Sequence, residues 1–190
     1  MSRRFRRKRR DEGTAMVEFA VIFSLLLVIA IGAFEYGMLF RDWLSVTVSA
    51  REGARVGASA GTITDADCII LEASAGALQS LNSGEVQHIS IYRSSPPGDF
   101  PGNASSFTNR YRPADAETPD LTCVGGSEWI EVNGGTNWQP GDRDNDGDDA
   151  DWIGVRVEFG HNWMTDFLWF SGTANFTDDA IFRMEPPAPS

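Results

Sequence analysis

Five of the six aspartates between residues 141 and 152 have the residue type and the spacing that calcium binding requires. They stand in the segment G-D-R-D-N-D-G-D-D-A-D-W and are Asp142, Asp144, Asp146, Asp148 and Asp151. The first three alternate and a glycine follows them, as in the first half of an EF-hand loop, where oxygens surround a hard cation and glycine permits a sharp turn. In this interpretation Asp148 offers its backbone carbonyl, and either Asp149 or Asp151 helps to close a shortened loop.

The second half of the loop departs from that pattern. Position twelve is Ile153 instead of the bidentate glutamate, and position nine is Ala150. Two interpretations stay open. The loop is either a weak Ca²⁺ site of the extracellular kind, with a dissociation constant of roughly 10⁻⁴–10⁻³ M, or an acidic turn that is simply solvated.

A second candidate for chemistry is a carboxylate inside an apolar segment. Glu18 and Glu35 are the only charged residues between Thr14 and Phe40. A charge at the centre of a membrane-spanning helix costs about 2.5–3.5 kcal/mol on insertion scales, so such residues tend to be functional and to have a partner. Glu18 either has that role or lies hydrated near the cytoplasmic end of the span. We interpret Glu35 as the outer boundary of the span, with pairing across helices as the alternative.

The segment that carries these carboxylates predicts one membrane-spanning helix. At ~1.5 Å per residue, residues 14–40 are roughly 40 Å long, which exceeds a hydrocarbon core of about 30 Å. Seven basic residues precede the segment, so the N-terminus is expected inside and the C-terminal domain outside the bacterial cytoplasmic membrane. The apolar run is longer than that of a secretory signal, which makes an ordinary signal peptide the weaker interpretation.

The residues around Glu18 resemble the type IV prepilin signature. A short basic leader ends just before Gly13, Glu18 is the fifth residue after that glycine, and Phe19 stands beside it. Two further segments, A-R-E-G-A-R-V-G-A at 50–58 and A-I-F-R-M-E-P at 180–186, narrow the resemblance to the TadE-like pseudopilins, or minor pilins, of tight-adherence (Tad/Flp) pilus systems. The resemblance covers residues 3–60 and the C-terminus, and nothing between about 93 and 172 is diagnostic.

This resemblance implies processing and assembly. A prepilin peptidase would cut between Gly13 and Thr14, where glycine permits close approach and an extended backbone. Glu18, with Phe19 beside it, would then pair with the N-terminal amine of a neighbouring subunit, because two charges that are unfavourable in lipid offset one another only when the helices are in register. The implied partners are other pilin or pseudopilin subunits, the prepilin peptidase, the inner-membrane assembly platform and membrane lipid.

Charge and the missing catalytic motifs limit the other functions. The net charge is −11, and it becomes −16 without residues 1–13, which argues against nucleic acid or anionic lipid as a ligand. His88 and His161 are the only histidines, and neither has a nucleophile–acid pattern beside it. We expect a structural protein and no enzyme. The alternative is a single-pass, membrane-anchored extracytoplasmic protein that binds calcium or adheres to a surface and does not polymerise.

Two cysteines, Cys68 and Cys123, follow the span. Outside the cytoplasm a pair of thiols is expected to form one disulfide. The alternative is two separate buried thiols, because sequence spacing does not show that they are close in space.

The predicted fold class is α+β, with a long N-terminal transmembrane and assembly helix followed by a small extracytoplasmic domain with a helix and an antiparallel sheet. The predicted parts are a basic leader at 1–13, the N-terminal helix at 14–61 and an α+β domain at 62–190 with the acidic loop at 141–152. In the long helix, Gly53, Gly57 and several alanines permit close approach by a neighbour.

The elements of the exterior follow from periodicity. A second helix is expected at 66–81, N-capped by Asp65, with a core face of Ile69, Leu71, Ala75, Leu78 and Leu81. Strands are expected at 86–92, 128–132, 152–159 and 175–184, with a long surface loop at 94–119. The aromatic residues Trp163, Phe167, Trp169 and Phe170 are interpreted as core, with a subunit contact or an adhesive surface as the alternative.

Overall fold

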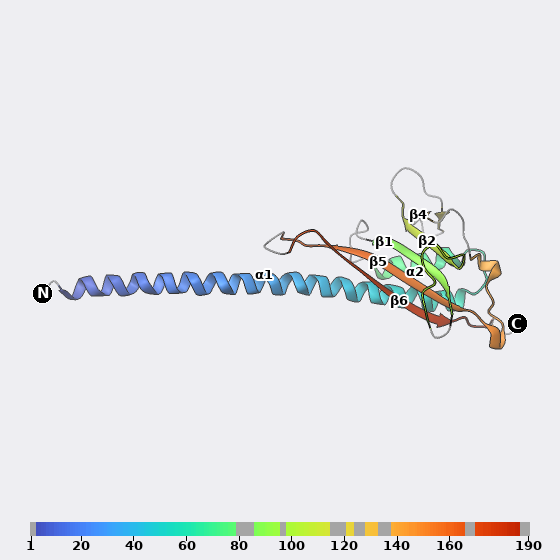
Figure 1. Ribbon diagram of the computed structural model, residues 1–190, viewed down its shortest axis with the longest axis horizontal. Coiled ribbons are helices and arrows are strands. Elements are labelled where there is room, and N and C mark those ends of the chain that lie inside the picture. The colour runs from blue at the N-terminus through green and yellow to red at the C-terminus, as the bar shows by residue number, and fades with distance from the viewer. Residues whose placement is uncertain are drawn as a thin grey trace. The chain divides into compact units, whose positions relative to one another are not determined.

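The computed structural model describes residues 3–78, 86–95, 98–114, 121–123, 128–132, 138–165 and 170–186. Its elements, labelled in Figure 1 where there is room, are α1 (Arg3–Ala60), α2 (Ala66–Ala77), β1 (Val86–Ser94), β2 (Thr108–Pro113), β3 (Leu121–Thr122), β4 (Glu128–Glu131), the short 3₁₀ helices η2 (Pro140–Asp142) and η3 (Gly147–Asp149), β5 (Trp152–Asn162) and β6 (Thr173–Arg183). The chain forms two compact units, Met1–Phe40 and Arg41–Ser190.

The predicted α+β fold class is confirmed. The strands form one sheet in the order β3-β4-β2-β1-β5-β6, and every neighbouring pair is antiparallel. The expected strands at 86–92, 128–132, 152–159 and 175–184 correspond to β1, β4, β5 and β6. β5 ends three residues after its predicted bound, and β6 begins two residues before its own. The two strands pair from Trp152–Arg183 to Asn162–Thr173.

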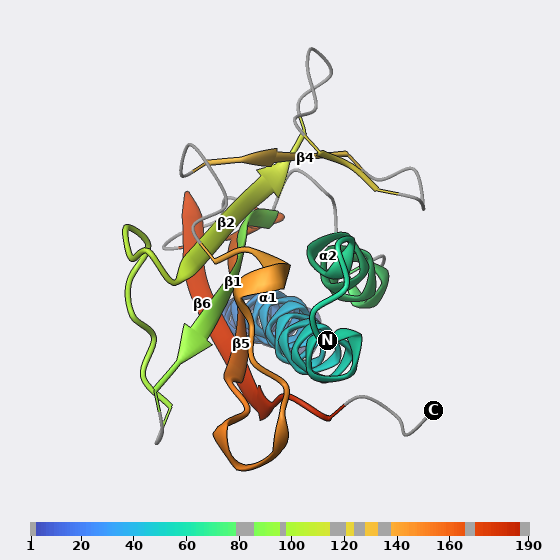
Figure 2. The same cartoon turned by 90° about the vertical axis from the view of Figure 1, so that its right-hand side faces the viewer.

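The second half of α1 belongs to the folded unit that begins at Arg41. Val46, Ala50, Ala54 and Ala58 are spaced by one helical turn and are buried in the core. A Cβ atom on Gly53 would lie 2.1 Å from Oγ of Ser74 in α2. The small residues therefore do permit close approach, and in this structure the neighbours are the chain's own sheet and second helix. Figure 2 shows α1 and α2 on the same face of the sheet.

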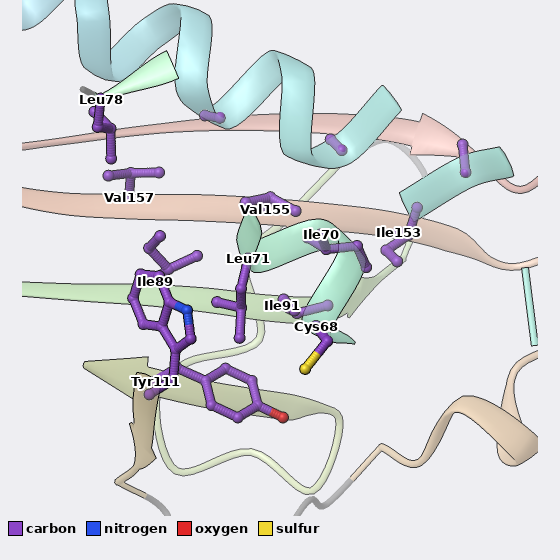
Figure 3. Close-up of a cluster of buried hydrophobic side chains, with 14 of the residues drawn as sticks. Cys68, Ile70, Leu71, Leu78, Ile89, Ile91, Tyr111, Ile153, Val155 and Val157 are labelled. Carbon is purple, nitrogen blue, oxygen red and sulfur yellow. The ribbon is translucent and has the colours of Figure 1, made fainter. Parts of the chain in front are cut away.

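The core lies between these two helices and the sheet, as Figure 3 shows. α2 contributes Ile70 and Leu71, which are fully buried, and β5 contributes Val155. Leu71 and Leu78 are buried as predicted, whereas Ile69 is 39% exposed, so its place in the predicted core was wrong. α2 rotates one position away from the expected face because it also buries the polar residue Asp67.

The start and end of α2 differ from the prediction. Asp65 is the N-cap residue, but its side chain makes no capping hydrogen bond. The first turn is held by backbone bonds, from the N–H of Ala66 to the carbonyl of Ile63 and from the N–H of Ile69 to the carbonyl of Asp65. The helix ends at Ala77, and the expected core residue Leu81 lies outside the described residues.

The expectation of a continuous surface loop at 94–119 was wrong, because β2 lies inside it. Its buried residues include Thr108, Asn109 and Tyr111, which do not form the apolar alternation on which the prediction relied. Asn109 and Tyr111 instead donate to the buried carboxylate of Asp67. A strand whose inward side chains bind a buried charge has no hydrophobic signature.

The C-terminal segment closes the end of α1. Gly61, at φ +61°, ends the helix as predicted. The N–H of Glu185 donates to the carbonyl of Ala58 at 2.9 Å, and the N–H of Met184 donates to the carbonyl of Asp151 at 2.9 Å. The motif A-I-F-R-M-E-P thus ends β6 and satisfies one of the helix-end carbonyls that would otherwise be unpaired.

Candidate functional site

The predicted cleavage position lies within α1. Gly13 and Thr14 are helical and exposed. A Cβ atom on Gly13 would meet no other atom within 4 Å, so packing in this chain does not require glycine there. Alanine would favour the helix by roughly 0.8–1.0 kcal/mol. The fold therefore gives no reason for glycine at this position, and the helical backbone would have to unwind locally if a peptidase needs it extended.

Glu18 is exposed, and no hydrogen bond or ion pair joins it to any other residue that the structure describes. It follows Thr14 by one helical turn, so both residues lie on one face of α1. Side chains of a helix lean towards its N-terminus, which directs the Glu18 carboxylate towards the backbone nitrogen of Thr14.

The apolar surface around Glu18 is also exposed. Among the described residues, one helix is long and apolar enough to cross a membrane, and its apolar window is not buried inside the protein. Phe19 is 66% exposed and stacks on Phe23 with ring centroids 5.6 Å apart. Glu35 differs from its surroundings because its side chain is fully buried. Its interpretation as the boundary of the span stays a prediction.

The predicted disulfide is present. Cys68 in α2 and Cys123 after β3 are bonded, and the bond joins residues 55 positions apart. The two sulfurs lie in the buried core. The bond ties α2 to the edge of the sheet where the shortest strand pairs, and the alternative of two separate thiols is excluded.

Beside the disulfide, a buried carboxylate binds three polar side chains. Asp67 accepts hydrogen bonds from Asn109 Nδ2 at 2.8 Å and from the Tyr111 hydroxyl at 2.9 Å, and it forms an ion pair with Arg143. The Arg143 guanidinium also lies over the Trp138 ring, 4.7 Å from its centroid. Burial, and then the Asp67 charge, raise the pKa of Tyr111. These contacts hold α2, β2 and residues 138–143 together, although Nε and Nη1 of Arg143 are buried with no hydrogen-bond partner among the described residues.

The acidic loop is tied to the sheet by two arginines. Asp151 is buried and pairs with Arg93 at 2.6 Å, and its other carboxylate oxygen accepts the N–H of Asp144 at 2.9 Å. Arg183 Nη2 donates to the backbone oxygens of Gly147 at 2.8 Å and Asp148 at 2.7 Å. Gly147 has φ +55°, so the glycine-dependent turn is present as expected.

These contacts bear on calcium binding without testing it. Asp144 Oδ1 accepts the N–H of Asp146 at 2.9 Å, and Asp142 ends η2. Among the residues that the structure describes, no three acidic, histidine or cysteine side chains are placed to hold a metal ion. The carbonyl of Asp148, which the sequence assigned to calcium, is bonded to Arg183. A calcium site in this loop stays a prediction.

Each histidine lies beside a carboxylate. His88 Nδ1 lies 2.9 Å from Arg110 Nη2 and 3.2 Å from Glu158 Oε2. His161 Nδ1 lies 2.7 Å from Asp42 Oδ2, and both side chains are buried. No sequence pattern indicated the second pair, because its members are 119 residues apart and neither stands in a recognised motif.

The comparisons bear on the N-terminal segment. Residues 13–55 match the family model described as TadE-like protein. That match contains Gly13, Thr14, Glu18 and Phe19 and ends within the part of α1 that packs on the sheet. No curated protein and no solved structure matches the chain.

Proposed function

We propose that this chain, whose residues 13–55 match the family model of TadE-like proteins, is a structural minor pilin or pseudopilin that takes part in the assembly of a tight-adherence pilus. The family is structural, which agrees with the two histidine–carboxylate pairs being packed into the folded unit. In this proposal α1 anchors the protein in the bacterial cytoplasmic membrane with its N-terminus inside. The domain that begins at Arg41 lies outside.

The observation that carries the proposal is the state of Glu18. Its carboxylate is exposed on an apolar helix and has no partner within the described chain. A charge in such a place is unfavourable in lipid unless a cation reaches it. Cleavage after Gly13 would create a cation, the α-amino group of Thr14, on every subunit. The amine of one subunit and Glu18 of the next would then pair only when the two helices are in register.

Gly13 supports the processing step. Packing within the chain does not require glycine there, whereas a peptidase that approaches the backbone closely would require it. We propose that a prepilin peptidase cuts between Gly13 and Thr14. The further partners of the protein are then other pilin subunits, the inner-membrane assembly platform and membrane lipid.

The test compares two substitutions in cells that form pili. Glu18→Ala is expected to leave insertion and cleavage intact and to abolish most piliation. The reason is that the α-amino group of Thr14 on a neighbouring subunit would have no carboxylate with which to pair. Gly13→Phe is expected to leave the precursor uncut. Glu52→Ala is the matched control, since Glu52 lies on the same helix and pairs only with its neighbour Arg55 among the contacts described. The measurements are the mature N-terminus by mass spectrometry and pilus counts by electron microscopy.

Two outcomes would reject the proposal. Normal piliation by the Glu18→Ala strain would remove the assembly role of that carboxylate. Recovery of the intact N-terminus from piliated wild-type cells would remove processing, and it would favour an anchored protein that does not polymerise.

A further inference from the structure

We infer that the membrane-proximal end of the β5–β6 hairpin binds the outer surface of the lipid bilayer that α1 crosses. This hairpin end consists here of residues 160–165 and 170–175, which the structure describes on both sides of the turn. The inference rests on the proposed membrane span and adds a second, peripheral contact with lipid.

Its position follows from the way β5 packs on α1 inside the folded unit. A Cβ atom on Gly57 would lie 2.9 Å from Ile153 Cδ1, and one on Gly53 would lie 3.2 Å from Val155 Cγ1. Further along the strand, His161 Nδ1 lies 2.7 Å from Asp42 Oδ2. The strand thus runs antiparallel to the helix.

That direction brings the end of β5 towards the residues next to the predicted span. As the residue number in β5 rises from 153 to 161, the residue beside it on α1 falls from 57 to 42. Asp42 stands two residues after Phe40, where the predicted span ends. The end of β5 at Asn162 therefore lies near Arg41, where the folded unit begins next to the predicted span.

The contact between His161 and Asp42 holds the hairpin end beside the residues of α1 that follow the predicted span. Asp42 and His161 are 4% and 2% exposed, so their contact is shielded from water and holds the strand to the helix. The second carboxylate oxygen of Asp42 accepts bonds from Arg41 Nε at 3.2 Å and Nη2 at 3.1 Å. The Arg41 side chain is about half exposed, so its guanidinium also reaches the level at which lipid phosphates lie.

The side chains of the hairpin end suit a lipid surface. Trp163 packs edge-on against His161 with ring centroids 5.2 Å apart, and it packs against the buried ring of Phe170 at 5.1 Å. Next to this cluster, Met164 is 63% exposed. Tryptophan prefers the membrane interface because its ring is apolar and its N–H is polar. Met164 adds an exposed apolar side chain that water disfavours.

The distribution of charge favours a lipid contact at the hairpin end and disfavours one over most of the remaining surface. The chain without its leader carries −16, and anionic headgroups would repel most of that surface. Between Gly160 and Asn175 the sequence contains one acidic residue, Asp166, which lies outside the described residues. The hairpin end is thus a nearly uncharged region of an acidic domain. It can approach the bilayer without the repulsion that argues against anionic lipid elsewhere.

The test places a fluorescent label on the full chain in lipid vesicles. The two native cysteines are bonded to each other, so Met164→Cys gives one reactive thiol for an environment-sensitive dye. Phe107→Cys is the matched control, because Phe107 is also exposed and lies beside Arg93, which pairs with Ile153 at the far end of β5. Leu25→Cys marks the span. Lipids with a nitroxide at the headgroup are the quencher for residues 164 and 107, and lipids with one in the acyl chain are the quencher for residue 25.

The expected result is several-fold stronger lipid quenching at residue 164 than at residue 107. Equal, weak quenching at both positions would overturn the inference. So would protection of residue 164 from both the lipid quencher and aqueous iodide, because the hairpin end would then be covered by protein. A label at residue 25 that acyl-chain nitroxide fails to quench would instead reject the span and the proposed function. Thr165→Cys repeats the test if the Met164 variant does not form its disulfide.

Discussion

At the scale of single residues, His88 shows how the fold sets a charge state outside the assembly segment. Its imidazole lies between Arg110 and Glu158 on the sheet. Burial is the largest influence and the Arg110 charge the next, and together they lower the pKa of His88 below its usual 6.5, although Glu158 acts in the opposite direction. The side chain therefore enters the folded state as a neutral acceptor for the arginine.

This shift predicts a pH dependence of stability. Between the lowered folded pKa and the unfolded value near 6.5, the unfolded chain binds more protons than the folded chain, so stability falls as pH falls through that window. His88→Asn keeps an acceptor for Arg110 and does not titrate. The variant should lose less stability than the wild type between about pH 7.5 and about pH 5, as measured by denaturant midpoints. Parallel curves for the two proteins would show that His88 titrates alike in both states.

A side chain that contradicts its surroundings can be selected from the sequence as a candidate, although the roles assigned to Glu18 and Gly13 stay predictions. Glu18 is an acid in an apolar run, and Gly13 precedes it at a fixed distance. Asp67 and Asp42 could not be selected in this way, because each stands in an ordinary polar context. Their buried contacts are made with residues that are distant in the sequence. Tyr111 and His161 come from strands 44 and 119 residues away. Pairings of this kind depend on tertiary packing and cannot be obtained from local spacing.

At the scale of elements, the acidic loop poses a choice between a metal and arginine. Calcium would need backbone and carboxylate oxygens that point inward, and the carbonyls of Gly147 and Asp148 are bonded to Arg183. Calcium and the Arg183 guanidinium therefore compete for the same atoms. The acidic composition of the loop is apparent from the sequence. Its contact with Arg183 could not be predicted, because that arginine comes from β6.

Arg183→Gln tests that competition. If the loop has latent calcium affinity, the variant should be stabilised by calcium more than the wild type, by about 1.4 kcal/mol when calcium is about tenfold above its dissociation constant. The measurement is the unfolding midpoint of the full chain in detergent with calcium, and with magnesium as the control ion. Arg156→Gln is the matched variant, since Arg156 pairs with Asp179 on the sheet and not with the loop. No calcium response in the Arg183 variant would leave the loop as an acidic turn.

At the scale of the whole molecule, the boundary of the folded unit determines which part of α1 packs in the core. The compact units divide between Phe40 and Arg41, whereas the sequence placed the division after residue 61. The sequence indicated a continuous helix and the correct end at Gly61. It did not indicate that residues 41–60 are core, because alanine and glycine at one-turn spacing suit a neighbouring subunit as well as the chain's own sheet. In this structure the chain's own sheet packs against the alanine and glycine face of residues 41–60.

This arrangement predicts that residues 41–190 fold as a soluble unit and residues 62–190 do not. Removal of 41–61 would expose the side chains that pack under α1, among them Ile153, Val155 and Ile70, and each fully buried residue of this kind contributes about 1.5–3 kcal/mol. Since domains are stable by only about 5–15 kcal/mol, the loss exceeds what the disulfide can offset. Near-ultraviolet circular dichroism and denaturant unfolding would compare the two fragments.

A pair of substitutions in residues 41–190 gives the control. Val46 is fully buried and Val48 is 55% exposed on the same helix. Val46→Ala should therefore destabilise the unit by about 1–3 kcal/mol, and Val48→Ala by less than about 0.5 kcal/mol. Equal effects, or a cooperative transition of residues 62–190 at the midpoint of the longer fragment, would mean that α1 only rests on the domain. The expected difference would instead make residues 41–60 of α1 an integral part of the folded unit.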